Sequence, residues 1–151
     1  MRRFNAENAE QVRVYAMNYA SRYEVSEQKL VQYLKRKFEK SPELETWIQS
    51  AVEACVRIQA VKDERVYGLL SDKLKRQGKG SRHIQMKIKS WGLEQHMQPT
   101  NREDEIARAG IWVEKFRSKN LDDKKIMQRL AARGFEFPTI LEAMKRGKYS
   151  D

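Results

Sequence analysis

The chain has 151 residues, of which 31 are lysine or arginine and 21 are aspartate or glutamate, so its formal net charge is +10 at pH 7. That length suits one domain or a short array of small units, and it excludes a large enzyme with a deep cleft. Seven glycines and three prolines provide few of the turns that an all-β protein needs, so we expect a helical chain.

Cysteine content and hydropathy indicate where the protein works. A single cysteine, Cys55, excludes an internal disulfide and a cysteine-cluster metal site, as expected in a reducing cytosol. No apolar run approaches the roughly 20 residues that a membrane span needs. The first five residues are not followed by the apolar core of a signal peptide. We therefore expect a soluble, cytoplasmic protein with no membrane partner.

Apolar residues at intervals of three and four predict three helices in the first part of the chain. The first has the inward stripe Val12, Tyr15, Ala16, Tyr19 and Tyr23. The second, capped by Ser26, has the stripe Leu30, Tyr33, Leu34 and Phe38. Ser41-Pro42 predicts the start of a third helix, with the stripe Leu44, Trp47, Ile48, Ala51, Val52, Cys55 and Val56. Because Cys55 lies on this stripe, a buried apolar role fits it better than that of a nucleophile.

Six further elements follow. Asp63 opens a helix with Val66, Leu69, Leu70 and Leu74 facing inward, and Gly78-Lys79-Gly80-Ser81 separates it from a helix carrying Ile84, Ile88 and Trp91. A short element around Gln95–Gln98 stops at Pro99. Three helices follow. The first begins at Asn101 or Asp104 and has Gly110 and Val113 facing inward; the second is capped by Asp122 and has Ile126 and Leu130 facing inward. The last begins at Pro138 and has Ile140 and Leu141 facing inward. No stretch alternates at period two, so we predict no strand.

Two of these helices share a pattern that indicates a repeat. Ile84-x3-Ile88-x3-Gly92-Leu93 matches Ile126-x3-Leu130-x3-Gly134-Phe135 at an offset of 42 residues. Any amphipathic helix has apolar residues every four positions, but the shared glycine followed by a large apolar residue favours a true repeat. Small helical units cannot bury much surface alone, so neighbouring units pack side by side. We predict three tandem three-helix repeats, over residues 1–61, 62–99 and 100–151.

The densest positive charge lies in the central repeat, where only Asp72 opposes seven cations between residues 73 and 89. One such run is typical of a solvated helix face, but a surplus of +10 over a small chain attracts polyanions, of which nucleic acid is the commonest in cells. Cations on the outer sides of the helices are therefore candidate phosphate contacts. They are Lys73, Lys75, Arg76, Lys79, Arg82, Lys89, Lys125, Arg129 and Arg133. Trp91, Trp112 and Tyr19 are candidates for stacking on bases, although core positions fit them better.

No motif in the sequence indicates a catalytic activity. Gly78-Lys79-Gly80-Ser81 lacks the spacing of a phosphate-binding loop. His83 and His96 have no cysteine partner that would make a zinc site. Acidic clusters fall at predicted helix starts, where the helix dipole favours them: Asp63-Glu64, Glu103-Asp104-Glu105 and Asp122-Asp123. We predict no catalytic residue, no cofactor and no metal, and hence no enzyme.

Three blocks of sequence resemble one known family. Asp63-Glu64-Arg65-Val66, the segment from Gly78 to Ile84 and Lys89-Ser90-Trp91-Gly92-Leu93 resemble the central repeat of the RecX regulatory proteins. Arg133-Gly134-Phe135 is similar to the end of the third repeat, and Ala20–Ser26 with Leu30 and Leu34 to the first. The similarity spans about residues 9–146. The chain departs from the family pattern at three places: no glycine precedes Phe38, Val66 replaces a phenylalanine, and Gln59-Ala60-Val61-Lys62 stands where a glycine and an apolar pair are usual.

The resemblance implies an all-α, elongated and curved array of three-helix repeats that binds the filament of the RecA recombinase and its DNA. On this interpretation the protein is a monomeric, non-enzymatic regulator of recombination and repair, which binds single- and double-stranded DNA with little sequence preference and generally inhibits the recombinase. Two alternatives remain. One is a sequence-specific helix-turn-helix protein whose recognition helix presents Arg82, Gln85, Met86 and Lys89 to a major groove. The other is a protein-interaction scaffold whose basic faces meet an acidic partner without DNA.

Overall fold

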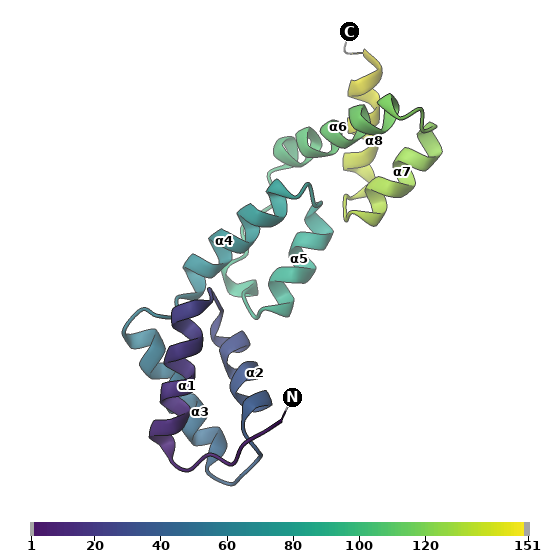
Figure 1. Cartoon of the computed structure of the whole chain (residues 1–151). Coiled ribbons are helices and arrows are strands. Elements are labelled where there is room, and N and C mark those ends of the chain that lie inside the picture. The colour runs from purple at the N-terminus through teal and green to yellow at the C-terminus, as the bar shows by residue number, and fades with distance from the viewer. Residues whose placement is uncertain (1, 150–151) are drawn as a thin grey trace. The chain divides into compact units, whose positions relative to one another are not determined.

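The computed structural model describes residues 2–149. Over this range it contains α-helices and one single-turn 3-10 helix, and no strand (Figure 1). The predicted all-α fold is confirmed. The elements are α1 (Ala9–Arg22), α2 (Glu27–Lys37), α3 (Leu44–Arg57), α4 (Asp63–Arg76), α5 (Ser81–Ser90), η1 (Glu94–His96), α6 (Arg102–Ser118), α7 (Asp123–Ala132) and α8 (Phe137–Tyr149). None of the described helices is long and apolar enough to span a bilayer.

Side-chain caps fix the start of several helices. The predicted caps of α2 and α7 are confirmed, since Ser26 accepts a hydrogen bond from the Lys29 amide and Asp122 from the Lys125 amide. Asn101, one of the two predicted starts of α6, accepts from the Asp104 amide. The prediction for α3 was early, because Ser41-Pro42 forms a turn in which the Leu44 amide donates to the Ser41 carbonyl, and the helix begins only at Leu44.

The chain divides into two compact units. Unit 1 comprises Met1–Gly68 and Trp91–His96. Within it α1 packs mainly against α3, and α2 contacts both (Figure 1). The side chains at its centre are completely or almost completely buried: Val12, Ala16, Leu30, Leu34, Phe38, Ile48, Cys55 and Val61. Cys55 is therefore a core residue, as predicted.

Unit 2 comprises Leu69–Ser90 and Met97–Asp151. Its largest helix contact joins α6 to α8, and α7 packs against both. The core side chains come from these three helices and the turn before α8: Ile106, Ala109, Val113, Phe116, Ile126, Leu130, Phe135, Ile140, Ala143 and Met144. The boundary between the units falls within α4, whereas the predicted repeats are defined by sequence periodicity. Their boundaries and their arrangement stay predictions.

Some side chains predicted to face inward are exposed. Leu69 is 50% exposed. The buried stripe of α4 consists of Val66, Leu70 and Leu74 at four-residue spacing, and Leu69 lies beside that stripe on the helix surface. Val56 and Leu141 are also exposed, at the edges of their stripes. Tyr23 is 56% exposed because α1 ends at Arg22, so that Tyr23 is its C-cap and no longer follows the helical stripe.

The glycines that mark the predicted repeat occupy equivalent backbone positions. Gly92 follows α5 with φ of 71° and Gly134 follows α7 with φ of 95°, a left-handed conformation that ends helices and favours glycine. In unit 1 the turn at Gly92 contacts the start of α2, because the Ser26 hydroxyl donates to the Trp91 carbonyl at 2.6 Å. The Glu27 amide of the same helix donates to Asp63 Oδ1 at 2.8 Å.

Candidate nucleic-acid interface

The excess positive charge of the chain belongs to unit 2. That unit has 19 lysines and arginines against 10 aspartates and glutamates, whereas unit 1 has 12 against 11. Unit 1 contains the basic first segment of the chain together with the acidic stretch that follows it, so its charges nearly cancel. All nine predicted contact residues lie in unit 2.

Two turns meet by their backbones in unit 2 and bring three of the predicted contact residues together. The Gly80 amide donates to the Arg133 carbonyl at 3.0 Å, and the Arg82 amide donates to the Gly134 carbonyl at 2.9 Å. A Cβ atom at Gly80 would lie 2.3 Å from the carbonyl carbon of Gly134. Glycine is therefore required for this approach, which places Lys79, Arg82 and Arg133 at one joint.

Two residues of α6 support the turn between α4 and α5. The Glu105 side chain is only 2% exposed and accepts a hydrogen bond from the Ser81 amide at 3.1 Å. Arg108 Nε donates to the Lys79 carbonyl at 3.3 Å. Burial lowers the pKa of Arg108, and the negative charges of Glu105 and Asp104 partly offset this by raising it. Sequence reasoning had assigned Glu105 to the dipole of a helix start. Its spacing of four from buried Ala109 was the signal that it faces the core.

Aromatic rings orient two of the arginines. The Arg133 guanidinium lies 3.5 Å from the centre of the Trp112 ring, and Arg129 lies 5.5 Å from the centre of the Phe116 ring. Trp112 is itself fixed, since its Nε1 donates to the Gly78 carbonyl at 2.9 Å. A guanidinium stacked on a ring keeps its in-plane N–H donors available for a phosphate. We call Lys79, Arg82, Arg129 and Arg133 the basic surface of unit 2.

The other predicted residues lie on helices of unit 2 but outside this joint. Lys73, Lys75 and Arg76 are exposed in the last turn of α4, and Lys89 is exposed in the last turn of α5. Lys125 is exposed in the first turn of α7. It lies about 12 Å along the helix axis from Arg133, given a rise of about 1.5 Å per residue. The structure thus groups four of the predicted residues and places the other five on the surrounding helices.

His83 adds a titratable group at the same joint. Its Cβ would be 2.5 Å from a Cβ added at Gly134, so that only glycine fits there. Burial lowers the pKa of His83, and the charges of Lys79 and Lys87 lower it further. Near pH 7 the imidazole is therefore neutral, and it becomes a cation only at lower pH or next to an added anion.

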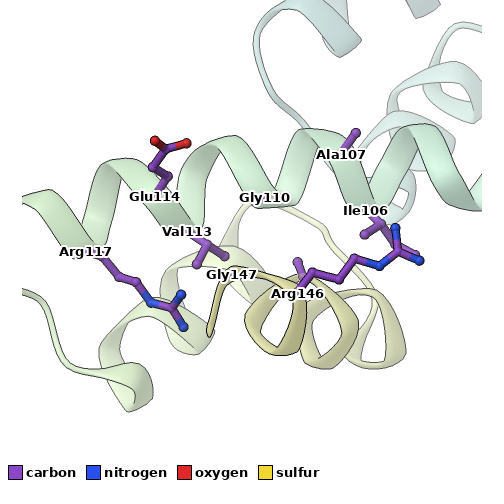
Figure 2. A pocket seen from close by; sticks show the side chains of 9 residues that line it. Ile106, Ala107, Gly110, Val113, Glu114, Arg117, Arg146 and Gly147 are labelled. Atoms are coloured by element: carbon purple, nitrogen blue, oxygen red, sulfur yellow. The ribbon is translucent and has the colours of Figure 1, made fainter. Parts of the chain in front are cut away.

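A pocket of about 480 Å³ lies between α6 and α8, away from these residues. Figure 2 shows Arg117 and Arg146 at its two ends, with Gly110 and Gly147 between them. Both arginines already have protein partners. Arg146 pairs with Glu103 at 2.9 Å and with Glu142, and Arg117 donates to the Met144 carbonyl at 3.3 Å. The two arginines at this pocket thus take part in contacts within unit 2.

The all-helical fold of this chain is similar to the folds of solved structures. The crystal structure of RecX from Lactobacillus salivarius aligns with a TM-score of 0.77 and 15% identity, over 94% of this chain and 97% of that one. A crystal structure of the regulatory protein RecX aligns with a TM-score of 0.65 and 16% identity, over 91% and 73%. The sequence itself matches no protein-family model and no curated protein. The resemblance to RecX is thus confirmed, and at these identities it establishes the fold.

Proposed function

We propose that the protein is a RecX-type regulator, which binds the RecA recombinase filament and its DNA and lowers recombinase ATPase and strand-exchange activity without being an enzyme itself. The observation that carries this proposal is the concentration of the positive charge in unit 2 of a chain with the RecX fold. Both the fold and the charge are needed. The fold supplies the class of partner, and the charge supplies a physical reason for affinity.

The basic surface of unit 2 suits phosphates better than base edges. Arg129 and Arg133 are held over aromatic rings, so they present guanidinium edges with little conformational freedom to lose on binding. Contacts to phosphates position a protein on nucleic acid but carry no sequence information. We therefore propose binding to single- and double-stranded DNA with little sequence preference.

Regulation of the recombinase requires only that the bound protein favour one state of the filament over another. A ligand shifts such an equilibrium by its difference in affinity for the two states. A tenfold difference corresponds to about 1.4 kcal/mol, which is enough to change the rate of a process that depends on the disfavoured state.

The direct test is recombinase ATPase on single-stranded DNA with this protein titrated in. We expect ATPase activity to decrease as the concentration of this protein rises. In the double variant Arg82→Glu with Lys89→Glu, the concentration that gives half of this decrease should be about tenfold higher or more. The matched control is Lys40→Glu with Arg57→Glu, which makes the same change in total charge at exposed positions of unit 1. No change in ATPase at any ratio of the two proteins would contradict the proposal.

The two alternative functions predict different binding. A helix-turn-helix protein would show one preferred DNA site and a stable dimer. A scaffold would show no retention on DNA at moderate salt. Weak binding to DNA of any sequence, together with an effect on the recombinase, separates the regulator from both.

A further inference from the structure

Three tyrosines of unit 1 lie ring beside ring at the edge of its core. The rings of Tyr19 in α1 and Tyr33 in α2 are parallel to within 10°, with centres 3.7 Å apart. The ring of Tyr23, at the end of α1, lies 4.9 Å from that of Tyr19 and is tilted by 46°. We call these residues the tyrosine ladder.

The ladder is only partly explained by packing. Its inner rings, Tyr19 and Tyr33, are half-buried against a core whose fully buried members are Val12, Ala16, Leu30 and Leu34. Tyr23 adds a third ring, tilted against that of Tyr19, and is 56% exposed. Burial does not require a third ring at this position, so the exposed end of the ladder is available to a ligand.

The surroundings of the ladder are positively charged. Arg22 and Arg36 are exposed, and within residues 2–149 neither guanidinium forms an ion pair. Burial raises the pKa of Tyr33 most, and Arg22 and Arg36 oppose this shift, which places both charges close to the ladder. The acidic residue next to Tyr23 is Glu24, whose carboxylate is paired with Arg65 Nε at 3.1 Å.

We infer that the tyrosine ladder is a stacking site for the unpaired bases of a single strand of nucleic acid, with Arg22 and Arg36 contacting the adjacent phosphates. Every base has a π face that stacks on an aromatic ring, and flanking cations follow the backbone. In a duplex these faces are already covered by neighbouring base pairs, so the site selects single strands. The inference presupposes the nucleic-acid binding proposed above and adds a second site, in unit 1.

The test compares two labelled strands of equal length and charge, oligothymidylate and an abasic strand, by fluorescence anisotropy with the full-length protein. The ratio of the two dissociation constants isolates the contribution of the bases, because phosphate contacts are common to both. We expect the protein to prefer oligothymidylate by about 5- to 100-fold. Tyr23→Leu should remove this preference, whereas Tyr23→Phe, which keeps the ring, should retain it.

Two further variants serve as controls. Val14→Ala changes an exposed apolar residue of α1 and should leave the preference unchanged. Arg22→Gln and Arg36→Gln should weaken the binding of both strands by a similar factor, so that the ratio stays the same while the salt dependence decreases.

The outcomes separate this inference from the proposed function. Equal binding of the two strands by the unmodified protein, or a preference that survives in Tyr23→Leu, would overturn the stacking site and leave the regulator intact. Failure to bind either strand would count against both. Competition by an acidic peptide that depends on Tyr23, without any base preference, would assign the ladder to a protein partner instead.

Discussion

Gln59 holds a backbone conformation that suits glycine. It follows α3 with φ of 61°, and its carbonyl accepts a hydrogen bond from Arg65 Nη1 at 3.3 Å. A side chain in this left-handed region costs about 1 kcal/mol or more. Residues 59–62 are also where the chain departs from the RecX pattern, in which a glycine is usual. We predict that Gln59→Gly raises the free energy of unfolding by about 1 kcal/mol, measured by urea denaturation.

Asn120 provides the matched control, since it has a φ of 62°. Asparagine tolerates the left-handed region better than glutamine, so Asn120→Gly should give a smaller gain. An equal gain at both positions, or a loss at Gln59, would contradict a conformational cost specific to Gln59.

His83 predicts a dependence of stability on pH. Burial, Lys79 and Lys87 lower its pKa in the folded protein, from about 6.5 in an unfolded chain. Between the two pKa values the unfolded chain binds more protons, so stability is present above about pH 6.5 and decreases as pH falls through this window. The difference between the unfolding free energy of the unmodified protein and that of His83→Gln should therefore decrease from pH 7.5 to 5.5. A difference that stays constant with pH would contradict this prediction.

A bound phosphate would favour the protonated imidazole and so reverse the shift of the His83 pKa. Affinity for DNA should accordingly increase as pH falls in the unmodified protein, and it should increase less in His83→Gln. Fluorescence anisotropy with a labelled duplex measures both proteins under the same conditions.

At the scale of elements, the joint between the α4–α5 turn and the α7–α8 turn depends on glycine. A Cβ at Gly80 would lie 2.3 Å from both the Gly134 carbonyl carbon and the Phe135 amide nitrogen, which are backbone atoms that cannot simply rotate away. We predict that Gly80→Ala lowers the free energy of unfolding by about 2–3 kcal/mol. Thermal and urea unfolding followed by circular dichroism measure the loss.

Gly68→Ala is the control within α4, because a Cβ there meets nothing within 4 Å. Replacing glycine in a helix interior should stabilise the protein by about 0.5–1 kcal/mol. If Gly80→Ala were as stable as Gly68→Ala, the close approach of the two turns would not exist in solution.

Local features of the elements were predictable from sequence, whereas their partners were not. The caps Ser26 and Asp122 could be predicted, because a cap joins a side chain to an amide only three residues further along the sequence. The ring under Arg133 belongs to Trp112, and the amide held by Glu105 belongs to Ser81, 24 residues away. Such contacts depend on how helices pack, and periodicity alone does not specify the facing residue.

At the scale of the whole molecule, the two units differ in net charge. The basic first segment and the acidic stretch after it fold into unit 1, whose charges nearly cancel, so the excess of the chain falls in unit 2. The predicted boundary after residue 61 already separated a nearly neutral first part of the chain from a basic remainder, but periodicity did not predict that residues 91–96 belong to unit 1. The choice of Lys73, Lys75, Arg76, Lys79, Arg82, Lys89, Lys125, Arg129 and Arg133 as contacts stays a prediction.

Salt dependence tests whether this charge is used. If about six cations contact phosphates, the affinity for duplex DNA should fall roughly as the fifth power of salt concentration. Arg82→Gln with Lys89→Gln should lower this exponent by about two, whereas Lys40→Gln with Arg57→Gln in unit 1 should leave it unchanged. Equal effects of the two pairs would show that total charge, rather than the predicted contact residues of unit 2, determines binding.

Co-sedimentation with a preassembled RecA filament tests the central proposal most directly. The filament is stabilised with a non-hydrolysable nucleotide, and the salt concentration is set where the protein no longer binds the same DNA without recombinase. We predict that the protein still sediments with the filament, and that Arg82→Glu with Lys89→Glu reduces the bound fraction. Binding to the filament no stronger than to bare DNA would contradict the proposal that this chain is a regulator of the recombinase.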